Sequence, residues 1–90
     1  MTDEELHALL LETGHKHHEA YAESDGADPE WALWYAAYMQ ARIWDGLGRV
    51  LSRSDLVYLF KLGDREARAS EDPAQWPVIY ARLLREFAAE

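Results

Sequence analysis

Apolar residues recur along this chain at intervals of three and four positions, the spacing that places side chains on one face of an α-helix. Four stretches show this pattern, at about residues 3–23, at 31–51, after Ser52 and after Trp76. No stretch alternates apolar and polar residues as a half-buried strand would. The pattern predicts an all-α fold, a compact four-helix bundle-like domain with short loops, in which residues 1–90 form one domain.

Three of the predicted helices carry a single apolar face, which is expected to be buried against the other helices. In the first helix it comprises Leu6, Leu9, Leu10, Thr13, His17, Ala20 and Tyr21. In the third it comprises Leu56, Leu59, Phe60, Gly63 and Ala67. In the fourth it comprises Ile79, Tyr80, Leu83, Leu84 and Phe87.

The stretch 31–51 differs because it is apolar on two sides. One side comprises Leu33, Ala36, Ala37, Gln40, Ile43, Leu47 and Leu51, and the opposite side comprises Trp31, Trp34, Tyr35 and Tyr38. A helix that is apolar nearly all round is usually buried. We therefore expect a central helix that runs through the middle of the molecule or buries its aromatic side against another chain. Gly46 and Gly48 weaken this helix, which is expected to bend or end there.

Local signals mark the helix starts. Thr2 with Glu5 has the spacing of a capping box, and so has Ser52 with Asp55, although Ser54 alone is an alternative cap. The segment 24–29 is rich in turn-forming residues. Within it, Asp28 followed by Pro29 is expected to begin the second helix.

The starts of the second and fourth helices resemble each other. Asp28-Pro29 is followed by Trp31, Tyr35 and Ala36, and Asp72-Pro73 is followed by Trp76, Tyr80 and Ala81, with one residue inserted. Two copies are too few for a repeat protein, so we interpret the similarity as one capping solution used twice.

Charge is distributed unevenly along the chain. Residues 1–30 hold nine acidic side chains and one basic side chain, Lys16, whereas the other sixty residues hold eight of each, so the net charge of −8 lies in the first third. Such a surface repels nucleic acid and attracts cations or a basic protein partner. The absence of cysteine, the acidic amino terminus and the lack of a long apolar run favour a cytoplasmic protein without a membrane segment.

All four histidines lie between residues 7 and 18, among carboxylates, which makes the first helix a candidate metal site. Glu4 with His7 and Glu12 with His15 each have Glu-x-x-His spacing, and Glu19 follows His15 by four residues. Bundle di-metal centres take such pairs from several helices, but the other helices here have no histidine. A divalent metal would therefore need a second subunit, or a mononuclear site of His15, His18 and Glu19 with an acid from the 25–28 turn. The alternative is a solvated acidic face.

A second candidate is the junction of the first two helices. If they form an antiparallel hairpin around the 24–29 turn, His17 and His18 lie beside Trp31, Trp34, Tyr35 and Tyr38, with Asp25 or Asp28 positioned to orient a histidine. Aromatic walls with a few polar groups are typical of small-ligand pockets, and His17 would be a candidate general base. The structural alternative is a core in which phenol and indole tips satisfy a buried histidine.

Two other motifs predict no chemistry. Gly46-Leu47-Gly48 lacks the third glycine and the preceding strand of a nucleotide-binding loop. Every serine lies at a predicted turn or cap, so no nucleophile triad is predicted.

The segment DGADPEWALWYAAY, preceded by His17-His18, resembles a family of small uncharacterised bacterial all-helical proteins with the pattern Asp-Gly-x-Asp-Pro-x-Trp-x-x-Trp-Tyr-Ala. The resemblance is strongest at residues 17–38 and loose over 6–80. It implies an all-helical fold and no activity.

Three functional hypotheses follow from the sequence. The first is a non-enzymatic interaction module that forms a homodimer or other homo-oligomer, or docks a partner, through the aromatic side of the second helix. The second is a small ligand- or metal-binding protein or enzyme that uses His17 and His18 beside Trp31, Trp34 and Tyr35. The third is an immunity or antitoxin-type protein that covers a basic partner.

Overall fold

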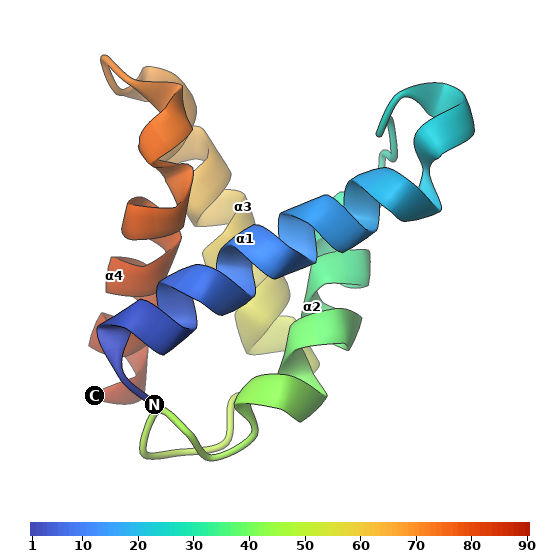
Figure 1. Cartoon of the computed structure of the whole chain (residues 1–90). Coiled ribbons are helices and arrows are strands. Elements are labelled where there is room, and N and C mark those ends of the chain that lie inside the picture. Colours follow the sequence, from blue (N-terminus) through green and yellow to red (C-terminus); the bar gives the residue numbers. More distant parts are fainter.

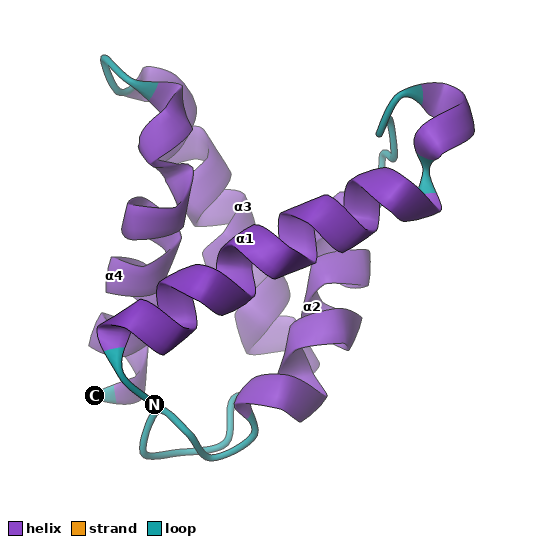
Figure 2. Cartoon of the chain, in the orientation of Figure 1, coloured by secondary structure: helices purple, strands orange, loops and turns teal.

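Four α-helices and no strand make up the fold in the computed structural model, which describes all 90 residues (Figures 1 and 2). The helices are α1 (Asp3–Ala20), α2 (Trp31–Ile43), α3 (Arg53–Ala69) and α4 (Trp76–Ala88). Two short 3₁₀ helices, η1 (Ala22–Ser24) and η2 (Pro73–Gln75), precede α2 and α4. The all-α, bundle-like fold predicted from the apolar pattern is confirmed.

The helices form a closed ring of contacts in which each packs on two others. α1 contacts α2 and α4, and α3 contacts the same two helices. Figure 1 shows α1 crossing in front, with α3 behind and α2 and α4 on either side. All four helices therefore share the core, and α2 packs on α1 and α3.

The predicted caps form at α1 and α3. The Glu5 backbone N–H donates to Thr2 Oγ1 at 3.1 Å, and the Thr2 N–H donates to Glu5 Oε1 at 2.8 Å. Ser52 and Asp55 make the equivalent pair, both at 3.0 Å, so Ser52 and not Ser54 caps α3. These caps satisfy N–H groups that have no partner within the helix.

One continuous core holds the ring together. Its buried members are Leu6, Leu10, Ala32, Ala36, Met39, Ile43, Leu51, Leu56, Leu59, Phe60, Tyr80 and Leu84. The predicted apolar faces supply most of it: all five predicted residues of α3 are buried. In α1, Leu6, Leu10, Thr13 and His17 are buried as predicted, whereas Ala20 is exposed.

The second helix is shorter than predicted. It ends at Ile43, because Trp44 adopts a φ of +40° that interrupts the helix. Gly46 then folds back so that its N–H donates to the Ile43 carbonyl at 2.7 Å. A Cβ at Gly46 would lie 2.8 Å from that carbonyl oxygen, so the turn requires glycine. The residues from 44 to 51 are turn and loop.

The buried face of α2 also differs from the prediction. It comprises Ala32, Ala36, Met39 and Ile43. Leu33, predicted in the core, is 48% exposed, and the four aromatic residues of the opposite side are half-buried. The helix is thus rotated so that its alanine and aliphatic side chains face the core and its large rings lie at the edge of the packing.

Candidate functional site

Four aromatic rings from the first turns of α2 and α4 face one another. Within each helix the rings are neighbours: the ring centroids of Trp31 and Tyr35 are 5.3 Å apart, and those of Trp76 and Tyr80 are 5.0 Å apart. Between the helices, Trp31 lies 6.5 Å from Tyr80, and Tyr35 lies 6.4 Å from Trp76. We call these four residues the aromatic box. The two similar helix starts in the sequence therefore meet in space.

Small residues of α3 and α1 make room for the box. A Cβ at Gly63 would lie 2.6 Å from Cδ1 of Tyr80, so this ring rests directly on the α3 backbone. On α1, a Cβ at Gly14 would lie 3.2 Å from Tyr35 Oη and 3.3 Å from Trp76 Cζ2. Glycine is thus used on both sides of the box for close approach.

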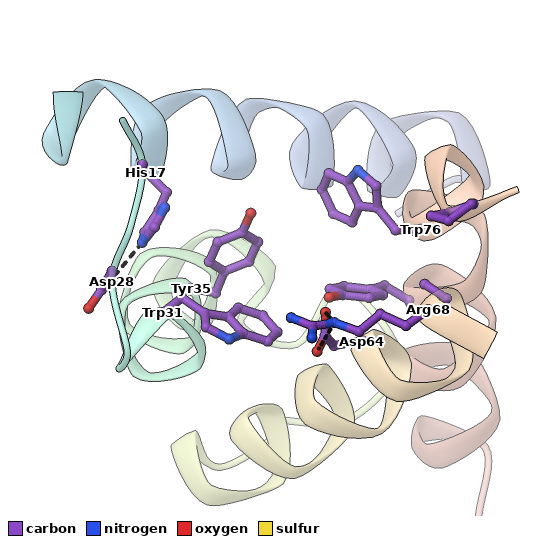
Figure 3. Close-up of a pocket in the computed structure, with 11 residues that line it drawn as sticks. His17, Asp28, Trp31, Tyr35, Asp64, Arg68 and Trp76 are labelled. Carbon is purple, nitrogen blue, oxygen red and sulfur yellow. Dashed lines mark hydrogen bonds and ion pairs between the residues drawn. The ribbon is translucent and has the colours of Figure 1, made fainter. Parts of the chain in front are cut away.

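The box opens onto a cavity of about 360 Å³ (Figure 3). Besides the four rings, its lining residues are His17, Gly26, Asp28, Asp64, Ala67, Arg68 and Pro73. The volume is within the range of small-molecule sites. The lining combines four aromatic rings with four ionisable side chains, His17, Asp28, Asp64 and Arg68. All four helices or the turns before them contribute to it.

A buried His–Asp pair forms one end of the cavity. His17 Nε2 donates to Asp28 Oδ2 at 3.0 Å, and the two side chains are only 8% and 7% exposed. Oδ1 of Asp28 accepts from the Glu30 N–H at 3.0 Å. The hydrogen bond from His17 holds the pKa of Asp28 below its usual value, so the carboxylate is charged at neutral pH. The pair ties the end of α1 to the start of α2.

The imidazole of His17 is also enclosed by rings. Its centroid lies 4.9 Å from Tyr21, 5.1 Å from Trp34 and 5.5 Å from Tyr35. Burial, and then the nearby charge of Asp28, raises the pKa of Tyr21. The predicted junction of His17 with the aromatic residues of the second helix therefore exists.

The opposite end of the cavity carries an ion pair on α3. Arg68 Nε lies 3.1 Å from Asp64 Oδ2, and the arginine is exposed (Figure 3). Burial raises the pKa of Tyr35, and burial together with the charge of Asp64 raises that of Tyr80. Both phenols therefore stay protonated at neutral pH.

Only some of the residues predicted for this site line the cavity. His17, Trp31 and Tyr35 line the cavity, whereas His18, Trp34 and Tyr38 do not. The rings of Trp34 and Tyr38 stack on each other with centroids 5.3 Å apart. His18 is exposed, with Nε2 3.9 Å from Asp25.

Tyr38 has its own partners away from the cavity. Its hydroxyl donates to Glu12 at 2.6 Å, and the Arg42 guanidinium lies 3.6 Å from its ring centroid. These contacts account for the aromatic side of α2 within a single chain.

The predicted mononuclear metal ligands do not converge. His15 Nε2 pairs with Glu19 at 3.0 Å, but His18 turns toward Asp25. No group of three or more histidine, aspartate or glutamate side chains in the structure is arranged to hold a metal ion. Residues on one exposed helix face spread outward, so a cluster in sequence does not make a coordination shell.

Several acidic side chains of the first third are compensated within the chain. Asp3 pairs with Arg85, Glu12 lies 3.9 Å from Arg42, and Glu19 pairs with Lys16. Part of the negative charge that suggested a basic partner is thus used internally.

No family model matches the chain, and no curated protein or solved structure is significantly similar to it. The resemblance at residues 17–38 therefore adds no relative of known activity. No helix combines the length and apolarity that crossing a membrane would need.

Proposed function

We propose that this protein binds a small molecule in the cavity of the aromatic box. The observation that carries the proposal is the arrangement of four rings from two separate helix starts around an open volume of about 360 Å³. Here Trp31, Tyr35 and Trp76 are left half-buried, with ring surface available to a ligand.

The polar groups at the two ends of the cavity would orient such a ligand. His17 and Asp28 at one end and Asp64 and Arg68 at the other supply charged and hydrogen-bonding groups, and the phenols of Tyr35 and Tyr80 are donors. Polar groups at defined positions in a ligand site fix the orientation of the ligand and confer specificity. We propose binding in the first place, because no serine, threonine, cysteine or lysine lines the cavity to act as an activated nucleophile.

The four indole N–H resonances in an NMR spectrum test this proposal. A panel of amines, carboxylates, sugars and heteroaromatic compounds is titrated into the protein. We expect at least one compound to shift the Trp31 and Trp76 signals with saturation. Trp44, which is exposed and lies outside the cavity, is the internal control and should not move. If no compound shifts Trp31 and Trp76, or if Trp44 shifts equally, the proposal is wrong.

Self-association is a second candidate function, and a different surface favours it. Leu33 of α2 and Tyr58 of α3 are 48% and 61% exposed, and both line one groove with Val57. Exposed apolar residues that lie together mark interaction sites more often than isolated ones do. We propose that a second copy of this chain covers the groove, in place of the aromatic side first predicted.

Solution mass tests this second candidate. We expect a dimer by light scattering, and we expect Tyr58→Glu to convert it to a monomer while the matched surface variant Arg65→Glu, away from the groove, has no effect. A monomeric protein over the accessible concentration range would rule it out.

A further inference from the structure

We propose that the ligand of the aromatic box is an organic cation of the quaternary or methylated ammonium class. This inference rests on the proposed small-molecule function and specifies its ligand. It rests on the arrangement of the rings, on the charges that line the cavity, and on the positions of lysine and arginine side chains over aromatic rings of the chain.

The rings supply the attraction. The face of an aromatic ring carries partial negative charge, and a cation within about 6 Å of its centroid is attracted, most strongly by tryptophan. Two indoles and two phenols surround the cavity, with neighbouring centroids 5.0–6.5 Å apart. Trp31, Tyr35 and Trp76 are partly exposed beside the cavity, whereas Tyr80 is buried, so three of the rings are accessible to one small cation. Enclosure by several rings is the usual way in which proteins recognise ammonium groups that lack N–H donors.

The chain already places its own cations on rings. The ammonium of Lys61 lies 5.4 Å from the Trp31 centroid, although Lys61 does not line the cavity. Arg42 and Arg49 lie 3.6 and 4.7 Å from the Tyr38 and Phe87 centroids. A ring of the box thus attracts a cation even without a ligand.

The charges of the lining also favour a cation. The two carboxylates, Asp28 and Asp64, face one permanent cation, Arg68, so the lining carries one net negative charge when His17 is neutral. The guanidinium of Arg68 is engaged by Asp64, and His17 is engaged by Asp28. An anionic ligand would therefore have to compete with a carboxylate for each partner. An ammonium group would likewise compete with Arg68 for Asp64, so it is the net negative charge of the lining that favours a cation over an anion.

A titration with choline and its neutral isostere tests the inference. In the isostere a tert-butyl group replaces the trimethylammonium group, so shape is kept and charge is removed. We expect choline to bind at least about tenfold more tightly by calorimetry, because a desolvated cation over several rings gains more than a neutral group of the same shape. Equal affinities, or no binding of choline to a protein that binds other compounds in the indole NMR titration, would overturn the inference and leave the proposed function standing. If no compound binds at all, the proposed function fails.

Two variants of opposite sign sharpen the test. Asp64→Asn removes the counter-charge and is expected to weaken choline binding by roughly fivefold or more, whereas Arg68→Gln removes the competing cation and is expected to tighten it. The isostere should be insensitive to both. Asp45→Asn, an exposed acid in the 44–51 loop, is the matched control and should leave both affinities unchanged. Circular dichroism confirms that each variant is folded. If Asp64→Asn weakens choline and the isostere equally, charge is not what the site recognises and the inference is wrong.

The same chemical group occurs on free amines and on methylated lysine side chains. A short peptide with one trimethyllysine, titrated beside the same peptide with the tert-butyl analogue, separates these sources. Tighter binding of choline than of the peptide identifies a free amine, and the reverse identifies a modified protein. Either result supports the inference provided that the charged member of each pair binds more tightly.

Discussion

The aliphatic part of the core and the aromatic box are built from the same four helices but packed in different ways. In the aliphatic part, Leu6, Leu10, Met39, Leu56 and Leu84 are fully enclosed. In the box, three of the four rings remain half-buried beside a cavity. Phe60 connects the two regions, with its ring centroid 5.8 Å from Tyr35 and 5.7 Å from Tyr80.

The difference shows how a chain of this size can keep a cavity and remain folded. The aliphatic side chains interdigitate at the density usual for protein interiors, whereas three of the rings border an open cavity. The rings keep part of their surface accessible beside the cavity, while the enclosed leucines supply close packing in the rest of the core. Stability and binding should therefore depend on different residues.

The largest expected effect on stability compares one residue of each region, Leu84 and Trp76, both of which lie in α4. Leu84→Ala should lower the free energy of unfolding by about 2–5 kcal/mol, because it leaves a hole in a fully buried site. Trp76→Leu removes one ring of the box and should cost less, about 1–2 kcal/mol, since the indole is partly exposed and leucine keeps part of its apolar contact. Urea unfolding measures both. A larger loss for Trp76→Leu would show that the box, not the aliphatic part, stabilises the fold.

A smaller effect is expected at the two glycines that border the box. Gly63→Ala places a Cβ 2.6 Å from Cδ1 of the buried Tyr80 ring, and overpacking of this kind costs about 1–3 kcal/mol in spite of the better helix propensity of alanine.

Gly14→Ala is the matched control for that substitution. Its nearest contacts, at 3.2–3.4 Å, are the ends of Tyr35 and Trp76, which can yield. We expect its free energy of unfolding to stay within about 0.5 kcal/mol of the parent. Thermal unfolding of both variants measures the two losses of stability. Equal losses for Gly63→Ala and Gly14→Ala would mean that Tyr80 does not rest on α3 as described.

The smallest expected effect is the loss of folding stability at acidic pH. The pKa of Asp28 is lower in the folded protein than its usual 3.8, chiefly because of the hydrogen bond from His17. The unfolded chain therefore binds a proton before the folded protein does, and the stabilisation is present above pH 3.8 and lost as the pH falls through and below that value. Melting temperatures measured across this range should fall more steeply for the parent than for Asp28→Asn. Parallel curves would contradict the link between α1 and the box.

Much of the fold was predictable from local signals. The caps at Thr2 and Ser52 and the buried face of α3 were identified correctly, because capping and helical periodicity depend on residues a few positions apart. The end of α2 was expected at Gly46 and Gly48, and the helix ends three residues before Gly46, at Ile43. The difference arises because Trp44, which carries no turn signal, adopts a positive φ.

The candidate site was predicted only in part. His17, Trp31 and Tyr35 were identified because the 24–29 turn brings α1 and α2 together locally. The α3 and α4 residues of the cavity were missed, since their positions depend on how the helices pack. One signal did point to them: the similar helix starts at Asp28 and Asp72. We interpreted that similarity as repeated capping, whereas both copies contribute a Trp–Tyr pair to one site.

The central claim, that the starts of α2 and α4 meet in one aromatic box, is tested most directly by nuclear Overhauser effects between ring protons. The account predicts cross-peaks between Trp31 and Tyr80 and between Tyr35 and Trp76, as well as those between Phe60 and Tyr80 that report on the adjoining core. A spectrum that contains the Phe60–Tyr80 peaks but lacks both pairs across the box would contradict it.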